Sequence, residues 1–149
     1  MAVFHYKFHL VPKSISAVSE ECDYWNGRNI DNMLLNQFRA ILPVDKSWDE
    51  TEEYRSCDKF GSVIYLWKEN GCVKDLQIEW TPGDLKTLQK VVEIAKQMDS
   101  HIFSRGTGSF LEADIELILA DWKRTKSARF ISEPAKVIVN SAEELKRST

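Results

Sequence analysis

The sequence predicts an α+β fold: a ferredoxin-like βαββαβ sheet with helices mainly on one face and extra C-terminal helices. Three observations lead to this prediction. An Asn-Gly pair at 70–71 separates two alternating segments, which indicates a β-hairpin over residues 62–80. Alternating aromatic residues indicate a strand at 3–11, and apolar residues repeating every three or four positions indicate helices at 29–42 and 81–99. This order of elements is typical of the ferredoxin-like sheet.

Length and composition indicate one soluble domain spanning 1–149, with 135–149 as a frayed tail. The chain is 43% hydrophobic and 29% charged, with a net charge of -3. A chain of this length can bury enough surface to fold without disulfides or a structural metal. No apolar run approaches the roughly 18 residues of a membrane-spanning helix. Nucleic-acid binding is not expected, because the best basic run, at 123–126, ends a predicted helix, where cations favour the helix dipole.

Residues 1–12 lack the basic start and long apolar centre of a secretory signal, so we expect a cytoplasmic protein. Cys22, Cys57 and Cys72 are an odd, widely spaced set without a CxxC motif. This pattern argues against a disulfide framework and against a zinc knuckle. We therefore expect neither a metal nor a cofactor.

The first strand places alternate side chains on opposite faces of the sheet. Its apolar face holds aromatic and leucine side chains, namely Phe4, Tyr6, Phe8 and Leu10, and its polar face holds His5, Lys7 and His9. The strand ends at Pro12, which cannot donate a ladder hydrogen bond. Asn29 or Asp31 can cap the following helix, whose predicted buried stripe is Ile30, Met33, Leu34, Phe38, Ile41 and Leu42.

A two-residue turn at 70–71 fixes the predicted register of the hairpin. Trp67 then pairs with Lys74, Tyr65 with Leu76 and Val63 with Ile78. This register gives a core face of Val63, Tyr65, Trp67, Leu76, Ile78 and Trp80. The opposite face carries Ile64, Leu66, Val73, Asp75, Gln77 and Glu79.

The connection at 43–60 is longer than an unstructured loop usually is, so it is either an extra short element or a functional loop. After the hairpin, Thr81 can cap a helix that has Pro82 in its first turn. A short strand, a glycine turn and a possible second strand follow at 101–112. Asp114 can cap a helix to about 124, and the last segments contain a turn at 127–134 and a frayed helix.

The polar face of the sheet offers one candidate site. If the first strand lies beside the third, then His5 and His9 lie near Asp75 and Glu79, with complementary charges. His5 and His9 are about 13 Å apart along a strand, which is too far for both to bind one metal. His9 with a carboxylate could form an acid/base pair. Cross-strand pairing on an exposed sheet is the alternative interpretation.

An acidic segment with flanking aromatic residues offers the second candidate site. Residues 14–59 carry ten acidic side chains against five basic ones. Such a surface steers basic partners and repels nucleic acid, and aromatic residues can anchor what it attracts. The candidate partner-binding residues are Trp25, Trp48, Asp49, Glu50, Glu52, Glu53 and Tyr54. A solvated loop that only keeps the protein soluble is the alternative.

Residues 127–134, with Ser47-Trp48 before the hairpin and the long helix after it, resemble a group of small uncharacterised bacterial proteins. The resemblance covers residues 48–134 and implies no activity, catalytic residue or site. By analogy with small acidic proteins, it suggests toxin immunity. We therefore expect a non-enzymatic protein-binding module with a basic protein partner, no membrane contact, and self-association through the open sheet face. The alternative is a small-molecule-binding protein or enzyme with a site on that face.

Overall fold

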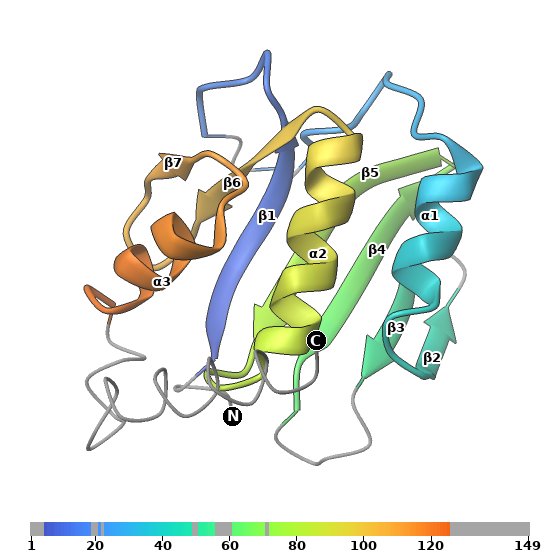
Figure 1. Cartoon of the computed structure of the whole chain (residues 1–149). Coiled ribbons are helices and arrows are strands. Elements are labelled where there is room, and N and C mark those ends of the chain that lie inside the picture. Colours follow the sequence, from blue (N-terminus) through green and yellow to red (C-terminus); the bar gives the residue numbers. More distant parts are fainter. Residues whose placement is uncertain are drawn as a thin grey trace.

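The structure is a computed structural model that describes residues 5–18, 21, 23–48, 51–55, 61–70 and 72–125. In these residues, seven strands form one sheet and three helices pack on it (Figure 1). The elements in chain order are β1 (Tyr6–Pro12), α1 (Asn32–Arg39), β2 (Val44–Trp48), β3 (Thr51–Arg55), β4 (Val63–Glu69), β5 (Cys72–Trp80), α2 (Leu85–Gln97), β6 (Ser100–Ser104), β7 (Phe110–Leu111) and α3 (Ile115–Trp122). The predicted α+β class is confirmed.

The strand order is β2-β3-β4-β5-β1-β6-β7, and every described pair is antiparallel. The predicted placement of β1 beside β5 is confirmed. The ferredoxin-like order is not confirmed, because the strand order of the whole sheet differs. A β2–β3 hairpin extends one edge and the short β7 extends the other. The connection at 43–60 therefore contains an extra pair of strands.

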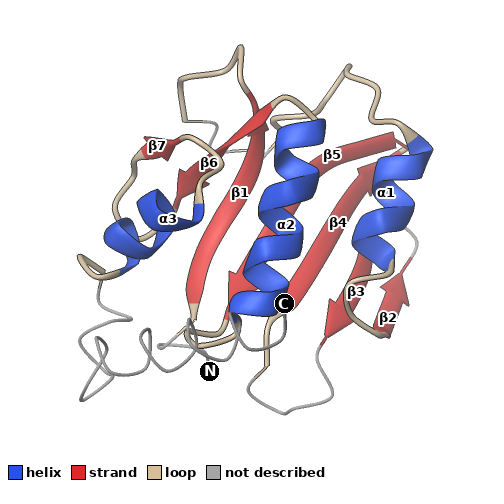
Figure 2. Cartoon of the chain, viewed as in Figure 1, coloured by secondary structure: helices blue, strands red, loops and turns tan. Residues whose placement is uncertain are grey.

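Helices α1 and α2 lie side by side on one face of the sheet, and α3 lies near β6 and β7 (Figure 2). The core lies between α2 and the central strands. Tyr6, Phe8 and Leu10 of β1 are buried there, opposite Trp80, Ile78 and Leu76 of β5. The predicted apolar face of the first strand is thus confirmed for these three residues, and Phe4 lies outside the described residues.

The predicted register of the β4–β5 hairpin is wrong beyond its tip. Glu69 pairs with Cys72 as predicted, and Asn70 has the positive φ of 53° that a tight hairpin turn requires. A bulge then shifts the pairing, so that Trp67 lies opposite Asp75 and Lys74 is the extra residue. The carbonyl of Lys74 accepts a hydrogen bond of 2.8 Å from the Trp25 backbone N–H. This bond stabilises the bulge, because it gives a partner to the residue that the strand ladder leaves unpaired. Gly71 lies outside the described residues.

The bulge exchanges the side chains of β4 that face the core, whereas Leu76, Ile78 and Trp80 of β5 are buried as predicted. Ile64 and Leu66 are fully buried opposite Ile78 and Leu76. Tyr65 and Trp67 lie on the other face and stack on each other, with ring centroids 6.1 Å apart. Trp67 is 38% exposed. Val63 also pairs differently, with Glu79 instead of Ile78, although it is buried.

The helix caps agree with the sequence at two of three helices. Asp114 caps α3, as predicted, and Asp31 caps α1, which decides between the two predicted caps Asn29 and Asp31. Asp84, not Thr81, caps α2 through its side chain, so the Thr-Pro-Gly sequence forms a turn before the helix. The predicted buried stripe of α1 is confirmed at Phe38 and wrong at Met33, which is 68% exposed because the helix buries Leu35 together with Phe38. The predictions for 127–134 and 135–149 lie outside the described residues.

A buried carboxylate anchors α3 to the sheet. Asp121 accepts hydrogen bonds from the Tyr6 hydroxyl at 2.7 Å and from the Thr107 hydroxyl at 2.8 Å. Arg124 donates to the same carboxylate at 3.0 Å. Tyr6 and Asp121 are both almost fully buried, so water cannot reach their polar groups. The hydrogen bond between them gives each buried group the partner that it needs.

Candidate functional site

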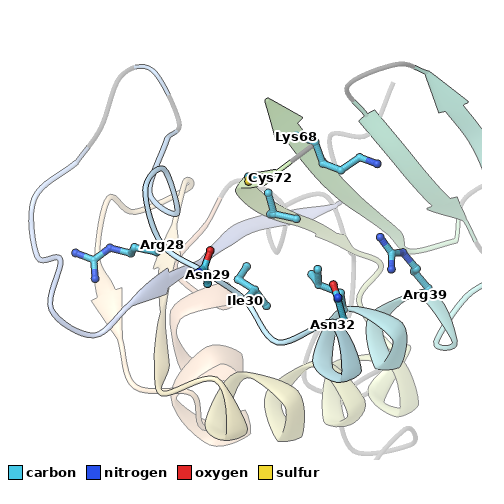
Figure 3. Close-up of a pocket in the computed structure, with 9 residues that line it drawn as sticks. Arg28, Asn29, Ile30, Asn32, Arg39, Lys68 and Cys72 are labelled. Atoms are coloured by element: carbon cyan, nitrogen blue, oxygen red, sulfur yellow. The ribbon is translucent and has the colours of Figure 1, made fainter. Parts of the chain in front are cut away.

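A pocket of about 340 Å³ lies between the start of α1 and the tip of the β4–β5 hairpin (Figure 3). Its described lining comes from the segment before α1, from α1 itself and from β4 and β5. The lining residues are Arg28, Asn29, Ile30, Asn32, Leu35, Arg39, Lys68, Cys72 and Val73. Three of these are cationic, three are apolar, and none of the described lining residues is acidic.

The segment before α1 is held in place by hydrogen bonds from Trp25 to the backbone carbonyls of two strands. The Trp25 indole N–H donates to the Leu10 carbonyl at 2.8 Å, and the Trp25 backbone N–H donates to the carbonyl of Lys74. Arg28 N–H closes a turn on the Trp25 carbonyl at 3.0 Å, with Gly27 at a φ of +76°. These bonds position Arg28 and Asn29 beside the hairpin tip.

The start of α1 is fixed separately. The Asp31 carboxylate accepts a hydrogen bond of 2.7 Å from the Met33 N–H, so its charge is used in the helix cap. The next residue, Asn32, is the first residue of the helix and lines the pocket. The pocket therefore lies beside the positive end of the α1 dipole, and the Asp31 carboxylate already places one negative charge there.

Two of the pocket cations converge on one buried carboxylate. Glu52 of β3 accepts two hydrogen bonds from Arg39, at 2.8 Å from Nε and 3.1 Å from Nη2. Lys68 Nζ lies 2.6 Å from Glu52 Oε2. The Tyr54 hydroxyl donates to Glu52 Oε1 at 2.7 Å. Of this cluster, Arg39 and Lys68 line the pocket, and their side chains lie on the same side of it in Figure 3. Glu52 and Tyr54 lie behind these two cations and do not line the pocket.

The cluster has a defined charge at neutral pH. Hydrogen bonding from Arg39 lowers the pKa of Glu52 to about 2, with further lowering by Lys68 and Tyr54 against the opposing effect of burial. The hydrogen bond to Glu52 raises the pKa of Arg39. Burial, followed by the hydrogen bond to Glu52, raises the pKa of Tyr54 to about 12. Glu52 is therefore ionised, Arg39 is charged and Tyr54 is neutral.

Acid should weaken the fold through Glu52. Its pKa is 4.5 ordinarily and about 2 in the folded protein, so its stabilisation is complete above pH 4.5 and is lost as pH falls towards 2. We expect the wild type to be more stable than Glu52→Gln at neutral pH and to lose that advantage across this range. Urea unfolding of both proteins at several pH values checks this. A stability difference that does not change with pH would contradict it.

At its described residues, 51–55, the acidic segment forms the strand β3, so the alternative of an extra short element is confirmed there and that of a functional loop is not. Glu52 and Glu53 lie on β3, at 8% and 4% exposure, and face opposite sides of the sheet. Arg55 pairs with Glu53 at 2.8 Å, so both acids have internal partners. Tyr54 is buried as well. Asp49 and Glu50 lie outside the described residues, and so does the side chain of Trp48 on β2.

Trp25 does not provide an exposed aromatic anchor either. It is buried, and its indole N–H is bonded to the carbonyl of Leu10. The polar sequence around Trp25 suggested a surface residue, but this segment packs across β1 and β5. Trp25 thus plugs the sheet instead of presenting a binding surface.

The structure brings His9 and Asp75 together on the polar face, but they are not open to solvent. His9 Nδ1 lies 3.0 Å from both carboxylate oxygens of Asp75, and each residue is 1% exposed. The rings of Tyr24 and Phe103 lie beside the His9 ring, with centroids 5.6 and 6.1 Å away. A substrate therefore has no direct access to this pair.

His5 lies at a separate position on the polar face. Its Nδ1 is 3.9 Å from Glu79, which also pairs with Lys7 at 3.4 Å. Within the described part of the chain, no group of three or more histidine, cysteine, aspartate or glutamate residues is placed to hold a metal ion. The predicted residues of the polar face, His5, His9, Asp75 and Glu79, thus form two separate pairs rather than one site. His9 pairs with Asp75, and His5 lies near Glu79.

Sequence reasoning missed the cationic lining of the pocket. Arg28 and Arg39 lie in a stretch where acids outnumber bases, and Lys68 lies in a strand. The three line one pocket because α1 and the segment before it lie beside the tip of the β4–β5 hairpin, although the Arg28 side chain points away from Arg39 and Lys68 in Figure 3. No local motif in the sequence signals this arrangement.

Comparison with protein-family models, curated proteins and solved structures finds no match to this chain. None of the helices in the described residues is both long and apolar enough to cross a membrane. The resemblance to small bacterial proteins stays a prediction.

Proposed function

We propose that this protein is a binding protein that holds the anionic group of a small ligand in the pocket between α1 and the β4–β5 hairpin. One observation carries the proposal. Three cations from separate elements, Arg28, Arg39 and Lys68, line one pocket whose described lining contains no acid. Arginine and lysine are the side chains that bind phosphate and carboxylate groups most strongly.

The rest of the lining fits the same kind of ligand. The amides of Asn29 and Asn32 can donate hydrogen bonds to anion oxygens. Ile30, Leu35 and Val73 offer an apolar surface for an uncharged part of the ligand. A volume of about 340 Å³ lies at the small end of the range for small-molecule sites. A compact anion with a small apolar body is the best match.

Phenyl phosphate is a suitable probe, and isothermal titration calorimetry is the measurement. Lys68→Met should weaken its binding about tenfold or more, because a hydrogen bond to a charged group is worth about 1.5–3 kcal/mol. Lys86→Met is the matched control, because Lys86 is an exposed lysine of α2 that does not line the pocket. Binding that is equal in both variants, or no binding to the wild type, would overturn the proposal.

The expectation of a basic protein partner stays a prediction. It now concerns Asp49 and Glu50, since Glu52 and Glu53 are buried and internally paired. Experiment can separate binding of a basic protein from binding of an anion in the pocket. Neutralising Asp49 and Glu50 removes negative charge from the β2–β3 connection and leaves the described pocket lining intact.

A further inference from the structure

We infer that the pocket has a second, uncharged subsite at Asn29 and Asn32, which selects anions that carry a hydrogen-bonding group at the end opposite their charge. The inference rests on the proposed function, because it concerns the other end of the same pocket. The charge of the lining is unevenly distributed. Arg39 and Lys68 lie on one side of the pocket, whereas the Arg28 side chain points away from them (Figure 3).

Helix α1 separates the charged end of the pocket from the uncharged end. Asn32, Leu35 and Arg39 all belong to α1 and all line the pocket. Residues at these spacings share one face of a helix. A rise of about 1.5 Å per residue places Asn32 roughly 10 Å from Arg39 along the helix axis. The pocket therefore runs from an amide at one end to a guanidinium at the other, with the apolar Leu35 side chain between them.

The amides at the uncharged end are available to a ligand. The Asp31 carboxylate already caps α1, so the neighbouring Asn32 side chain is not needed there. Within the part of the chain that the structure describes, no residue forms a hydrogen bond with the side-chain amide of Asn29 or Asn32. The Asn36 amide, by contrast, accepts a bond from Arg39. An amide both donates and accepts, so it can bind a hydroxyl, carbonyl or carboxamide group.

The charged end holds the anionic group, but its charge is partly neutralised before a ligand arrives. Glu52 accepts hydrogen bonds from Arg39 and lies 2.6 Å from Lys68. Attraction at this end is therefore weaker than that of two cations without an internal partner. Hydrogen bonds at the amide end do not depend on this charge, and a few such polar contacts fix the orientation of a ligand. The matching ligand is an anion joined through a short apolar body to a neutral polar group.

The first test compares phenyl phosphate with its para-carbamoyl and ortho-carbamoyl derivatives, by calorimetric titration of the wild type. The two derivatives have the same composition, but only the para isomer holds its carboxamide opposite the phosphate. At about pH 8 all the esters are dianions, so their charges are equal. We expect the para isomer to bind about tenfold more tightly than phenyl phosphate, as about two hydrogen bonds allow, and the ortho isomer to bind within about twofold of it. A para isomer that binds no more tightly than the ortho isomer would overturn the inference.

The second test locates the subsite through the ratio of the affinities for the para isomer and for phenyl phosphate. In the double variant Asn29→Ala with Asn32→Ala, this ratio should fall from about tenfold to within about twofold of unity. Gln97→Ala is the matched control, because Gln97 is an exposed amide at the end of α2 that does not line the pocket, and it should keep the ratio. The first test uses the wild type alone, so it stands even if the double variant does not fold.

The outcomes separate the inference from the proposed function. If the double variant binds both esters more weakly at an unchanged ratio, the amides hold the anion itself, which contradicts the uncharged subsite and supports the anion-binding pocket. Equal binding of all the esters by the wild type would likewise overturn the subsite alone. Absence of binding of every ester to the folded wild type would overturn the proposed function together with the inference.

Discussion

Replacing Trp80 with alanine is expected to lower the free energy of unfolding by about 3–5 kcal/mol. Trp80 is fully buried and makes edge-to-face contacts with Trp122 of α3 and Tyr6 of β1, with ring centroids 6.0 and 6.5 Å away. Its indole N–H also donates to the carbonyl of Asp84, the residue that caps α2. The substitution therefore leaves a cavity where β1, β5, α2 and α3 meet.

Trp67→Ala is the matched control for this prediction. Trp67 lies on the opposite face, is 38% exposed and stacks on the ring of Tyr65. Its removal should cost only about 1 kcal/mol, as partly exposed substitutions usually do. Urea unfolding of both variants measures the difference. A loss at Trp67 equal to or greater than that at Trp80 would show that the predicted hairpin register was right and the bulge wrong.

The second large loss of stability is expected when one member of the His9–Asp75 pair is removed. His9→Leu leaves the Asp75 carboxylate buried without its histidine partner, and removal of one member of a buried pair costs about 3–5 kcal/mol. We therefore expect a comparable loss in the free energy of unfolding. Thermal and urea unfolding of the single variant provide the measurement.

The double variant His9→Leu with Asp75→Leu separates charge burial from packing. Replacing both partners with apolar residues removes the uncompensated carboxylate, so most of the loss should be recovered. The two residues are in contact, so a double-mutant cycle that also includes the single variant Asp75→Leu is expected to give a large coupling energy. If the double variant is less stable than His9→Leu, the tight packing with Tyr24 and Phe103 outweighs the charge effect and the explanation fails.

The sequence was sufficient where local signals and tertiary contacts agree. The alternation of Tyr6, Phe8 and Leu10 and the caps at Asp31 and Asp114 predicted elements that the structure confirms. The Asn70 turn was also predictable, since few residues tolerate a positive φ. These features depend on neighbours in the chain and not on distant segments.

The register failed because a distant segment imposes it. The bulge at Lys74 is satisfied by the Trp25 N–H, which lies far away in the sequence. The sequence left 43–60 open between an extra short element and a functional loop, because glutamate is rare in strands. Glu52 and Glu53 are acceptable in β3 because Arg39, Tyr54, Arg55 and Lys68 provide their partners. The burial of His9 depends likewise on Tyr24, from a segment without regular periodicity.

The candidate site was beyond sequence reasoning for the same reason. Arg28, Arg39 and Lys68 come from a loop, a helix and a strand, and only the packing of α1 against the hairpin joins them. The acidic segment suggested a basic partner, yet one of its acids serves as a counter-charge for two pocket cations. The sign of the local sequence charge was therefore a poor guide to the charge of the pocket.

An NMR titration tests the proposed pocket most directly. Phenyl phosphate is added to the ¹⁵N-labelled protein, and the shifts of the backbone amides are followed. We predict saturable shifts concentrated at residues 28–30 and 32, at Lys68 and at Cys72 and Val73, which line the pocket. Shifts centred instead on His9 and Asp75, or no saturable shifts in a folded protein, would contradict anion binding between α1 and the hairpin.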